Sequence, residues 1–278
     1  MTAPSATLPV LTLATYPPTP SFTPTARFLS ALQQLYSTAA SDPSGHSLTY
    51  HLTLESYVRK LAARSADERL NRGPGEALLL ASAAQHVRRW ERPRGEYPEG
   101  LSGYKMWRTA LNKFHASIAS SVLRSAGYEE GNAADDALVE RVRELLLKKT
   151  LARPPLPREA ELKDPEAHLF EDAVCLTFLS LEFVKFALPY LSSSSASSSS
   201  SPSPSSSAAP SSSSAPPPTT SDPKLTPAKL AHIVAKTWAK MTPLGRGVAV
   251  EELVGGLPDE LNTVVLEAVG GIRDAWEQ

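Results

Sequence analysis

The segment from Ala83 to His115, AAQHVRRWERPRGEYPEGLSGYKMWRTALNKFH, organises the rest of the chain. His86 recurs at helical spacing with Leu79 and Ala83, so we expect it to face the interior. His115 shares a helical face with Leu111 and Ile118 on the next predicted helix. Prolines and glycines between the two histidines predict a loop: Pro93, Gly95, Pro98, Gly100 and Gly103. Two inward histidines joined by such a loop indicate a polar site.

This loop and its flanks are rich in arginine and aromatic residues. Arginine presents a fixed fork of donors that suits phosphate or carboxylate, and aromatic rings suit a nucleotide base. The predicted substrate-binding residues are Arg88, Arg89, Arg92, Arg94, Tyr104 and Arg108. The alternative is that Arg88 and Arg89 pair internally with Glu91, Glu171 or Asp172. Because the net charge of the 278-residue chain is only -1, a small anionic ligand fits better than a long nucleic acid.

Composition also bears on the compartment. The single cysteine, Cys175, excludes an internal disulfide and a cysteine zinc cluster, and it suits a reducing compartment. The start of the chain lacks the basic and apolar regions of a signal peptide. We therefore expect a cytoplasmic protein, or a nuclear one.

Helix signals recur along the chain, and no strand-like alternation competes with them. Residues 1–22 are rich in Pro, Thr and Ser and are expected to be disordered. A helical domain follows over 23–191, with helices expected at 48–64, 104–126 and 134–149, and one that carries His86. The almost pure Ser, Pro, Ala and Thr composition of 192–222 predicts a disordered insert. The helices of 223–278 are expected to dock on the same domain, because so short a segment makes a poor core alone.

Residues 169–191, LFEDAVCLTFLSLEFVKFALPYL, are long and apolar enough to suggest a membrane span. Glu171, Asp172, Glu182 and Lys185 lie within them, and charges in lipid are costly. We therefore interpret the segment as a central core helix. The predicted fold class is all-α, a single compact multi-helix domain with one Ser/Pro-rich insert.

Several short motifs resemble an uncharacterised family. They include the run from Ala84 to Arg94, then Tyr97-Pro98, Gly103-Tyr104, Trp107-Arg108, Lys148-Lys149, Asp164-Pro165-Glu166 and Phe170-Glu171-Asp172. This pattern resembles the domain-of-unknown-function family numbered 4202, over roughly residues 26–266 without the insert. Members are often labelled glutamyl-tRNA synthetase-like, but neither signature motif of such synthetases is present. The resemblance implies candidate site residues and no activity.

Histidines and carboxylates from three predicted helices also suggest a metal centre. His86, His115 and Asp172 form a ligand set suited to zinc, iron or manganese. Their order is similar to that of the all-helical HD phosphohydrolases, although Ala116 stands where those proteins have aspartate after the second histidine. Glu55 and Glu171 are then the candidate catalytic carboxylates. Either histidine could instead be a buried side chain bonded to a neighbouring acid.

The other histidines, His46, His51, His168 and His232, follow no pattern, and we interpret them as incidental. Trp90, Trp107 and Trp238 are expected to belong mostly to the core. Two hypotheses follow. The first is a metal-dependent hydrolase, or related enzyme, acting on a phosphorylated or nucleotide-like small molecule. The second is a non-catalytic helical module that binds RNA or a protein partner through the Arg/Trp-rich loop.

Overall fold

The computed structural model describes residues 8, 10–157, 161–183, 187, 227–253, 262–263 and 265. Within these residues every named element is a helix or helical turn, as the sequence predicts. The elements are α1 (Ala26–Ala40), α2 (Ser47–Arg64), α3 (Glu76–Ala84), η1 (Arg89–Glu91), η2 (Arg94–Glu96), α4 (Gly100–Ser125), α5 (Ala133–Leu147), α6 (Pro165–Thr177), η4 (Phe178–Phe183), α8 (Pro227–Trp238) and α9 (Pro243–Glu252).

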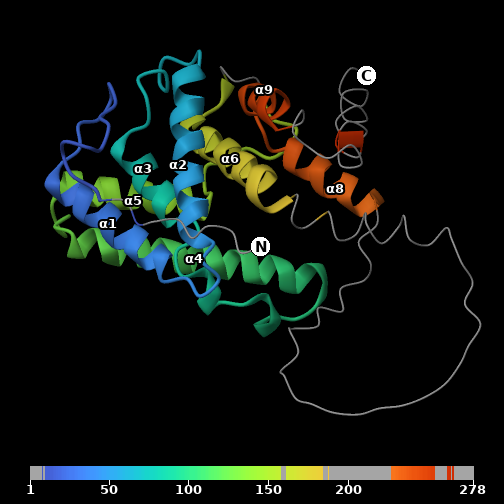
Figure 1. Cartoon of the computed structure of the whole chain (residues 1–278), viewed down its shortest axis with the longest axis horizontal. Coiled ribbons are helices and arrows are strands. Elements are labelled where there is room, and N and C mark those ends of the chain that lie inside the picture. Colours follow the sequence, from blue (N-terminus) through green and yellow to red (C-terminus); the bar gives the residue numbers. More distant parts are fainter. Residues whose placement is uncertain are drawn as a thin grey trace, which may run out of the picture.

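Helix α2 is the central element of the bundle. It contacts α1, α3, α6 and α9, and its apolar stripe of Leu54, Val58 and Leu61 is fully buried. Each such aliphatic side chain contributes roughly 1.5–3 kcal/mol when it is removed from water. Figure 1 shows α2 standing across the middle of the domain, with α4 running beneath it. The site described below lies where α2 begins.

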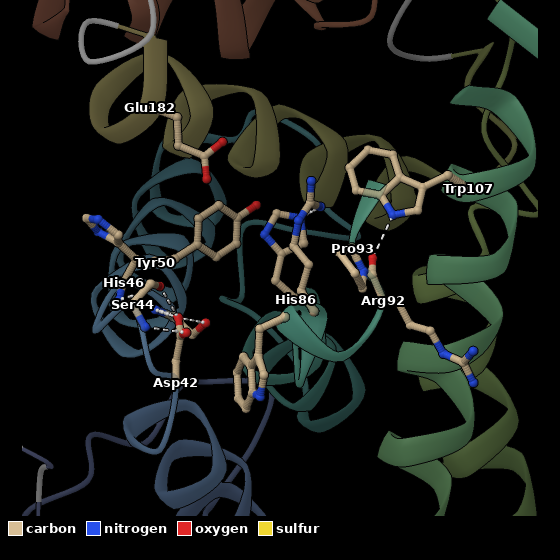
Figure 2. Close-up of a pocket in the computed structure, with 12 residues that line it drawn as sticks. Asp42, Ser44, His46, Tyr50, His86, Arg92, Pro93, Trp107 and Glu182 are labelled. Carbon is tan, nitrogen blue, oxygen red and sulfur yellow. Dashed lines mark hydrogen bonds between the residues drawn. The ribbon is translucent and has the colours of Figure 1, made fainter. Parts of the chain in front are cut away.

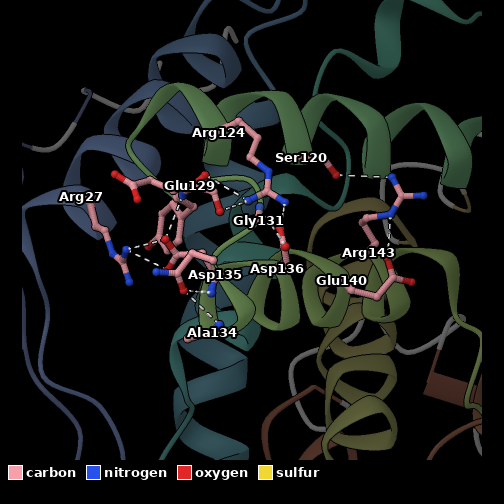
Figure 3. A network of polar contacts seen from close by, with 12 residues as sticks. Arg27, Ser120, Arg124, Glu129, Gly131, Ala134, Asp135, Asp136, Glu140 and Arg143 are labelled. Atoms are coloured by element: carbon pink, nitrogen blue, oxygen red, sulfur yellow. Dashed lines mark hydrogen bonds and ion pairs between the residues drawn. The ribbon is translucent and has the colours of Figure 1, made fainter.

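Helices α4 and α5 form an antiparallel hairpin fixed by a polar network (Figure 3). Gly127 ends α4 with a φ of +102°, a conformation that glycine adopts without strain. Asn132 then caps α5 by accepting hydrogen bonds from the amides of Ala134 and Asp135. Asp135 in turn forms an ion pair with Arg27 of α1, with an N–O distance of 2.8 Å. The network therefore ties the hairpin to the first helix.

Helix α9 packs on the bundle through α6 and α2. Asp172 accepts hydrogen bonds from the amide and hydroxyl of Thr242, at 2.8 and 2.6 Å. Thr242 is itself the N-cap residue of α9. Gly245 approaches so closely that a Cβ there would lie 2.5 Å from Cγ of Asp172. Asp172 thus holds the start of α9 against α6.

Four sequence-based expectations need correction or lie outside what is described. Helix α3 ends at Ala84, so His86 lies in the turn that follows it and not on a helix. The expected helix of 169–191 is helical through Phe183, but it changes at Thr177 from the α-helix α6 to the π-helical turn η4, and most of 184–191 lies outside the described residues. The predicted insert of 192–222 lies outside the described residues. Of the N-terminus expected to be disordered, 1–22, residues 10–22 are described, and Tyr16 there is buried and donates to Glu55. Among the described helices, none is long and apolar enough to cross a membrane.

Candidate functional site

A short loop after α3 delivers the central side chains of the site. Val87 is fully buried and anchors this loop in the core. Arg88 adopts a left-handed conformation with φ of +52°, which is uncommon for a residue other than glycine. This bend turns the chain into η1, so that His86, Arg89 and Trp90 all reach one pocket. The unusual backbone at Arg88 is therefore part of how the site is built.

The pocket has a volume of about 280 Å³ (Figure 2). It lies between the start of α2, the loop after α3, the first half of α4 and the turn η4. Its lining combines aromatic, basic and acidic side chains: Asp42, Ser44, His46, Ser47, Tyr50, His86, Arg89, Trp90, Arg92, Pro93, Trp107 and Glu182. Concave sites of this mixed character are typical of small-molecule binding.

Three histidines cluster where His86 lines the pocket, with His51 and His115 behind it. The backbone N–H of His86 donates to Nε2 of His51 at 3.2 Å, and the rings of His86 and His115 lie 6.0 Å apart, centre to centre. The ring of His86 also stacks on Tyr50 at 4.2 Å. The structure therefore places His86 and His115 close together and adds His51 from α2.

The hydrogen bonds define the protonation state of each imidazole. Arginine only donates, so Nε2 of His86, 3.2 Å from Nη1 of Arg89, must be the unprotonated nitrogen. Nε2 of His51 likewise accepts from an amide. His115 donates from Nδ1 to the carbonyl of Val87 at 2.9 Å, which leaves its buried Nε2 without a described partner. His86 and His51 are thus neutral with the proton on Nδ1, and His115 also carries a proton on Nδ1.

The electrostatics of the site agree with this assignment. Burial lowers the pKa of His51 to about 3 and that of His115 to about 4. Burial also lowers the pKa of His86 well below its usual range, and the charge of Arg89 lowers it further. At neutral pH the cluster of His51, His86 and His115 therefore carries no imidazolium charge.

Arg89 and Arg92 line the pocket, and the charge of Arg108 acts on Arg89. Arg89 is half-buried, and burial together with nearby Arg108 lowers its pKa, although a guanidinium stays protonated at neutral pH. Its guanidinium carbon lies 4.8 Å from the ring centre of Trp107. Among the described residues, no carboxylate lies within 4 Å of the guanidinium of Arg89 or of Arg108. Arg89 therefore remains available to an anion.

Asp42, on the opposite side of the pocket, has a structural role. Its carboxylate accepts hydrogen bonds from the amides and hydroxyls of Ser44 and Ser47, between 2.6 and 3.0 Å. Burial alone would raise the pKa of Asp42, but these hydrogen bonds outweigh burial and lower it. Asp42 thus organises the start of α2 and leaves little capacity for a ligand.

The other predicted arginines and Tyr104 have different surroundings. Arg88 pairs with Glu91, its Nε lying 2.5 Å from the carboxylate, as the internal-pairing alternative anticipated for this residue. Arg94 donates to the carbonyls of Tyr97 and Pro98 and so shapes the loop. Arg92 lines the pocket, but its guanidinium lies 5.1 Å from the ring centre of Phe114. Tyr104 is exposed beside Trp107. Of this set, Arg89 is the one whose charge faces the pocket.

The predicted catalytic carboxylates do not line the pocket. Glu55 is buried and accepts hydrogen bonds from the hydroxyls of Tyr16 and Tyr36 and from Arg59. Glu171 is buried against the ammonium group of Lys148. That ion pair lowers the pKa of Glu171 although burial alone would raise it. Both acids hold helices together.

The predicted metal centre is not assembled in the described part of the chain. There, no group of three or more His, Cys, Asp or Glu side chains is arranged to hold a metal ion. Asp172, the third predicted ligand, is bonded to Thr242 at the start of α9. The set of His86, His115 and Asp172 is therefore not formed, because the carboxylate of Asp172 is bonded to Thr242, the N-cap residue of α9.

Several site residues escaped the sequence interpretation. His51 and His168 were expected to be incidental, yet both are buried. For His51 a signal existed, because it shares a helical stripe with Leu48, Leu54 and Val58. Trp90 and Trp107 are half-buried at the pocket, not core residues. No pattern pointed to Glu182, whose position depends on the turn η4.

In the part of the chain that the structure describes, these features define a helical protein with a mixed polar and aromatic pocket beside a cluster of neutral histidines. The chain belongs to the family described as Domain of unknown function (DUF4202), whose model matches residues 29–193. The match covers more than half of the chain and includes every pocket residue, from Asp42 to Glu182. No curated protein and no solved structure matches the chain.

Proposed function

We propose that the pocket binds a small phosphorylated, nucleotide-like molecule. The observation that carries the proposal is the half-buried guanidinium of Arg89, whose described contacts are a neutral imidazole and an indole ring. A charge that has lost part of its water and has no described carboxylate within 4 Å is costly, and an anionic ligand would offset that cost. The planar fork of arginine suits the oxygens of phosphate.

Arg108 supports a doubly charged ligand group. Its charge contributes to lowering the pKa of Arg89, of His86 and of His115, so it lies close to all three, and it forms no described ion pair. Because two cations repel each other across the site, a phosphate monoester carrying nearly two negative charges matches them better than a carboxylate.

The size and the aromatic lining favour a compact ligand with a ring. About 280 Å³ lies near the lower end of ligand pockets, roughly 300–1,000 Å³. That volume suits a molecule the size of a mononucleotide and not a polymer. Tyr50, Trp90 and Trp107 offer ring faces on which a base could stack.

The proposal concerns binding and includes no reaction. The metal-assisted hydrolysis expected from the sequence needs a metal to activate water, and the described residues offer no three-donor group for one. A protein-binding module is the second candidate. It is favoured by the exposed apolar side chains of Leu101 and Met106 near the start of α4.

Calorimetric titration with AMP and with inorganic phosphate tests the proposal. We expect the wild-type chain to bind AMP, with an affinity that falls as salt is raised. Arg89→Gln should weaken binding by at least roughly tenfold, since it removes a charge-assisted contact. Arg72→Gln is the matched control, because Arg72 is exposed and has no described side-chain partner. Failure of every anion to bind, or equal binding by Arg89→Gln, would overturn the proposal and favour the second candidate.

A further inference from the structure

Among the described residues, Glu182 is one of two carboxylates that line the pocket, and the other, Asp42, is already occupied by Ser44 and Ser47. Glu182 extends from η4 toward Tyr50 (Figure 2). It forms no hydrogen bond or ion pair with any other described residue. Its negative charge nonetheless acts on the pocket, because after burial it contributes to raising the pKa of Tyr50. The charge of Glu182 also raises the pKa of Arg89, whereas burial and the charge of Arg108 lower it.

The backbone at Glu182 is also unusual. Helix α6 widens into a π-helical turn over Phe178–Phe183, and such turns are rare and frequently lie at functional sites. The turn is anchored by buried Leu179 and Phe183, so its register is fixed by the core. Adding a residue to a helical turn rotates the following side chains, and here the rotated side chain is Glu182.

A free carboxylate weakens a pocket that only has to bind phosphate. Like charges repel, and Glu182 would lower the affinity for a dianion held at Arg89. The arrangement becomes favourable if the ligand brings hydrogen-bond donors to the carboxylate, since an ionised carboxylate only accepts. The ligand should therefore be bipolar, with an anionic group at one end and hydroxyl or amino donors near Glu182.

We infer that Glu182 accepts hydrogen bonds from the vicinal hydroxyls of a ribose ring and so selects a phosphorylated riboside over phosphate alone. This inference rests on the proposed function, because Arg89 must hold the phosphate. Two oxygens of one carboxylate match two adjacent hydroxyls, and acidic side chains recognise ribose in this way in dinucleotide-binding proteins. The hydroxyl of Tyr50, which burial keeps protonated, lies beside the same region as a further donor.

The test compares three probes on one variant: AMP, 2′-deoxyAMP and inorganic phosphate. Glu182→Gln should weaken AMP binding by roughly tenfold, because a charge-assisted hydrogen bond is lost. The same change should leave phosphate binding unchanged or stronger, because a repulsive charge is removed. The preference of the wild type for AMP over 2′-deoxyAMP should shrink in the variant.

The matched control is Glu130→Gln, an exposed residue beyond the far end of α4. Trp107 lines the pocket, and Ser125 is the last residue of α4 before the turn that carries Glu130. The two are 18 residues apart along the helix, which corresponds to about 27 Å at 1.5 Å per residue. If Glu182→Gln does not fold, Glu182→Asp keeps the charge on a shorter side chain and should also weaken AMP binding.

The outcomes separate this inference from the proposed function. Equal strengthening of AMP and phosphate binding in Glu182→Gln would show that Glu182 merely competes for Arg89. Unchanged AMP binding in that variant would likewise overturn the ribose role. In both cases the proposed function stands, provided that Arg89→Gln still loses AMP. Absence of AMP binding by the wild type would overturn both.

Discussion

Nη1 of Arg89 donates a hydrogen bond to Nε2 of His86 at a distance of 3.2 Å. This contact fixes the tautomer of His86 and aligns a guanidinium with the pocket without neutralising it. Because His86 stacks on Tyr50 and its amide is bonded to His51, the arginine rests on a rigid support. A preorganised cation loses little freedom when it binds an anion.

Acid should destabilise the chain between about pH 6.5 and pH 4. His51 and His115 have lowered pKa values in the folded state, about 3 and about 4. Below pH 6.5 the unfolded chain therefore takes up protons that the folded chain does not, and the free energy of unfolding falls. Each histidine should contribute about 1–2 kcal/mol between pH 8 and pH 5.

Urea unfolding at pH 8, 6.5 and 5 measures this effect. The variant His51→Gln keeps an acceptor for the amide of His86 but does not titrate, so its stability should depend less steeply on pH. Stability that stays constant from pH 8 to pH 5 would contradict the assignment of neutral imidazoles.

His51→Leu should lower the free energy of unfolding by roughly 1–3 kcal/mol, because the amide of His86 loses its acceptor in a buried setting. His46→Leu is the control, since His46 is exposed and makes no described side-chain hydrogen bond. Its effect should stay within about 0.5 kcal/mol. Equal stability of the two variants would show that the His51 contact contributes nothing.

Asp172→Ala should loosen α9 without changing any metal content. Its carboxylate accepts two hydrogen bonds from Thr242, so removing it should cost roughly 2–4 kcal/mol and increase amide exchange at the start of α9. Metal analysis by mass spectrometry provides the second readout. If His86→Ala and Asp172→Ala both lost bound metal, that result would support the predicted metal centre shared by the two residues.

Gly103→Ala should disturb the loop that leads into α4. A Cβ at Gly103 would lie 1.7 Å from the carbonyl oxygen of Pro98, which also accepts a hydrogen bond from Arg94. The backbone must shift to admit it, and we expect a loss of roughly 1–3 kcal/mol in thermal or urea unfolding. Gly95→Ala is the matched control, since no atom lies within 4 Å of its added methyl group.

Helical periodicity was enough to predict the fold class and most helices. The expected helix of 48–64 corresponds to α2, and that of 134–149 to α5, because caps such as Asn132 and apolar stripes are local signals. The break at Ala84 was not predicted, since His86 and Trp90 continue the helical spacing while the backbone at Arg88 turns left-handed. The spacing of apolar residues indicates a helical pattern but does not indicate where tertiary contacts end the helix.

The candidate site was predictable only in part. The convergence of His86 and His115 followed from two inward faces joined by one loop. The role of Asp172 did not, because its partner Thr242 lies 70 residues away, beyond a segment whose path no local pattern specifies. Glu182 reaches the pocket through a π-helical turn, which depends on packing and has no sequence signature of its own.

A crystal structure of the chain soaked with AMP tests the central claim most directly. We predict phosphate density in the pocket between α2, α4 and η4, with phosphate oxygens about 2.7–2.9 Å from the guanidinium of Arg89. The base should lie against the ring of Tyr50, Trp90 or Trp107. Density for AMP elsewhere on the surface, or an empty pocket at saturating AMP, would contradict the claim that Arg89 holds a phosphorylated ligand.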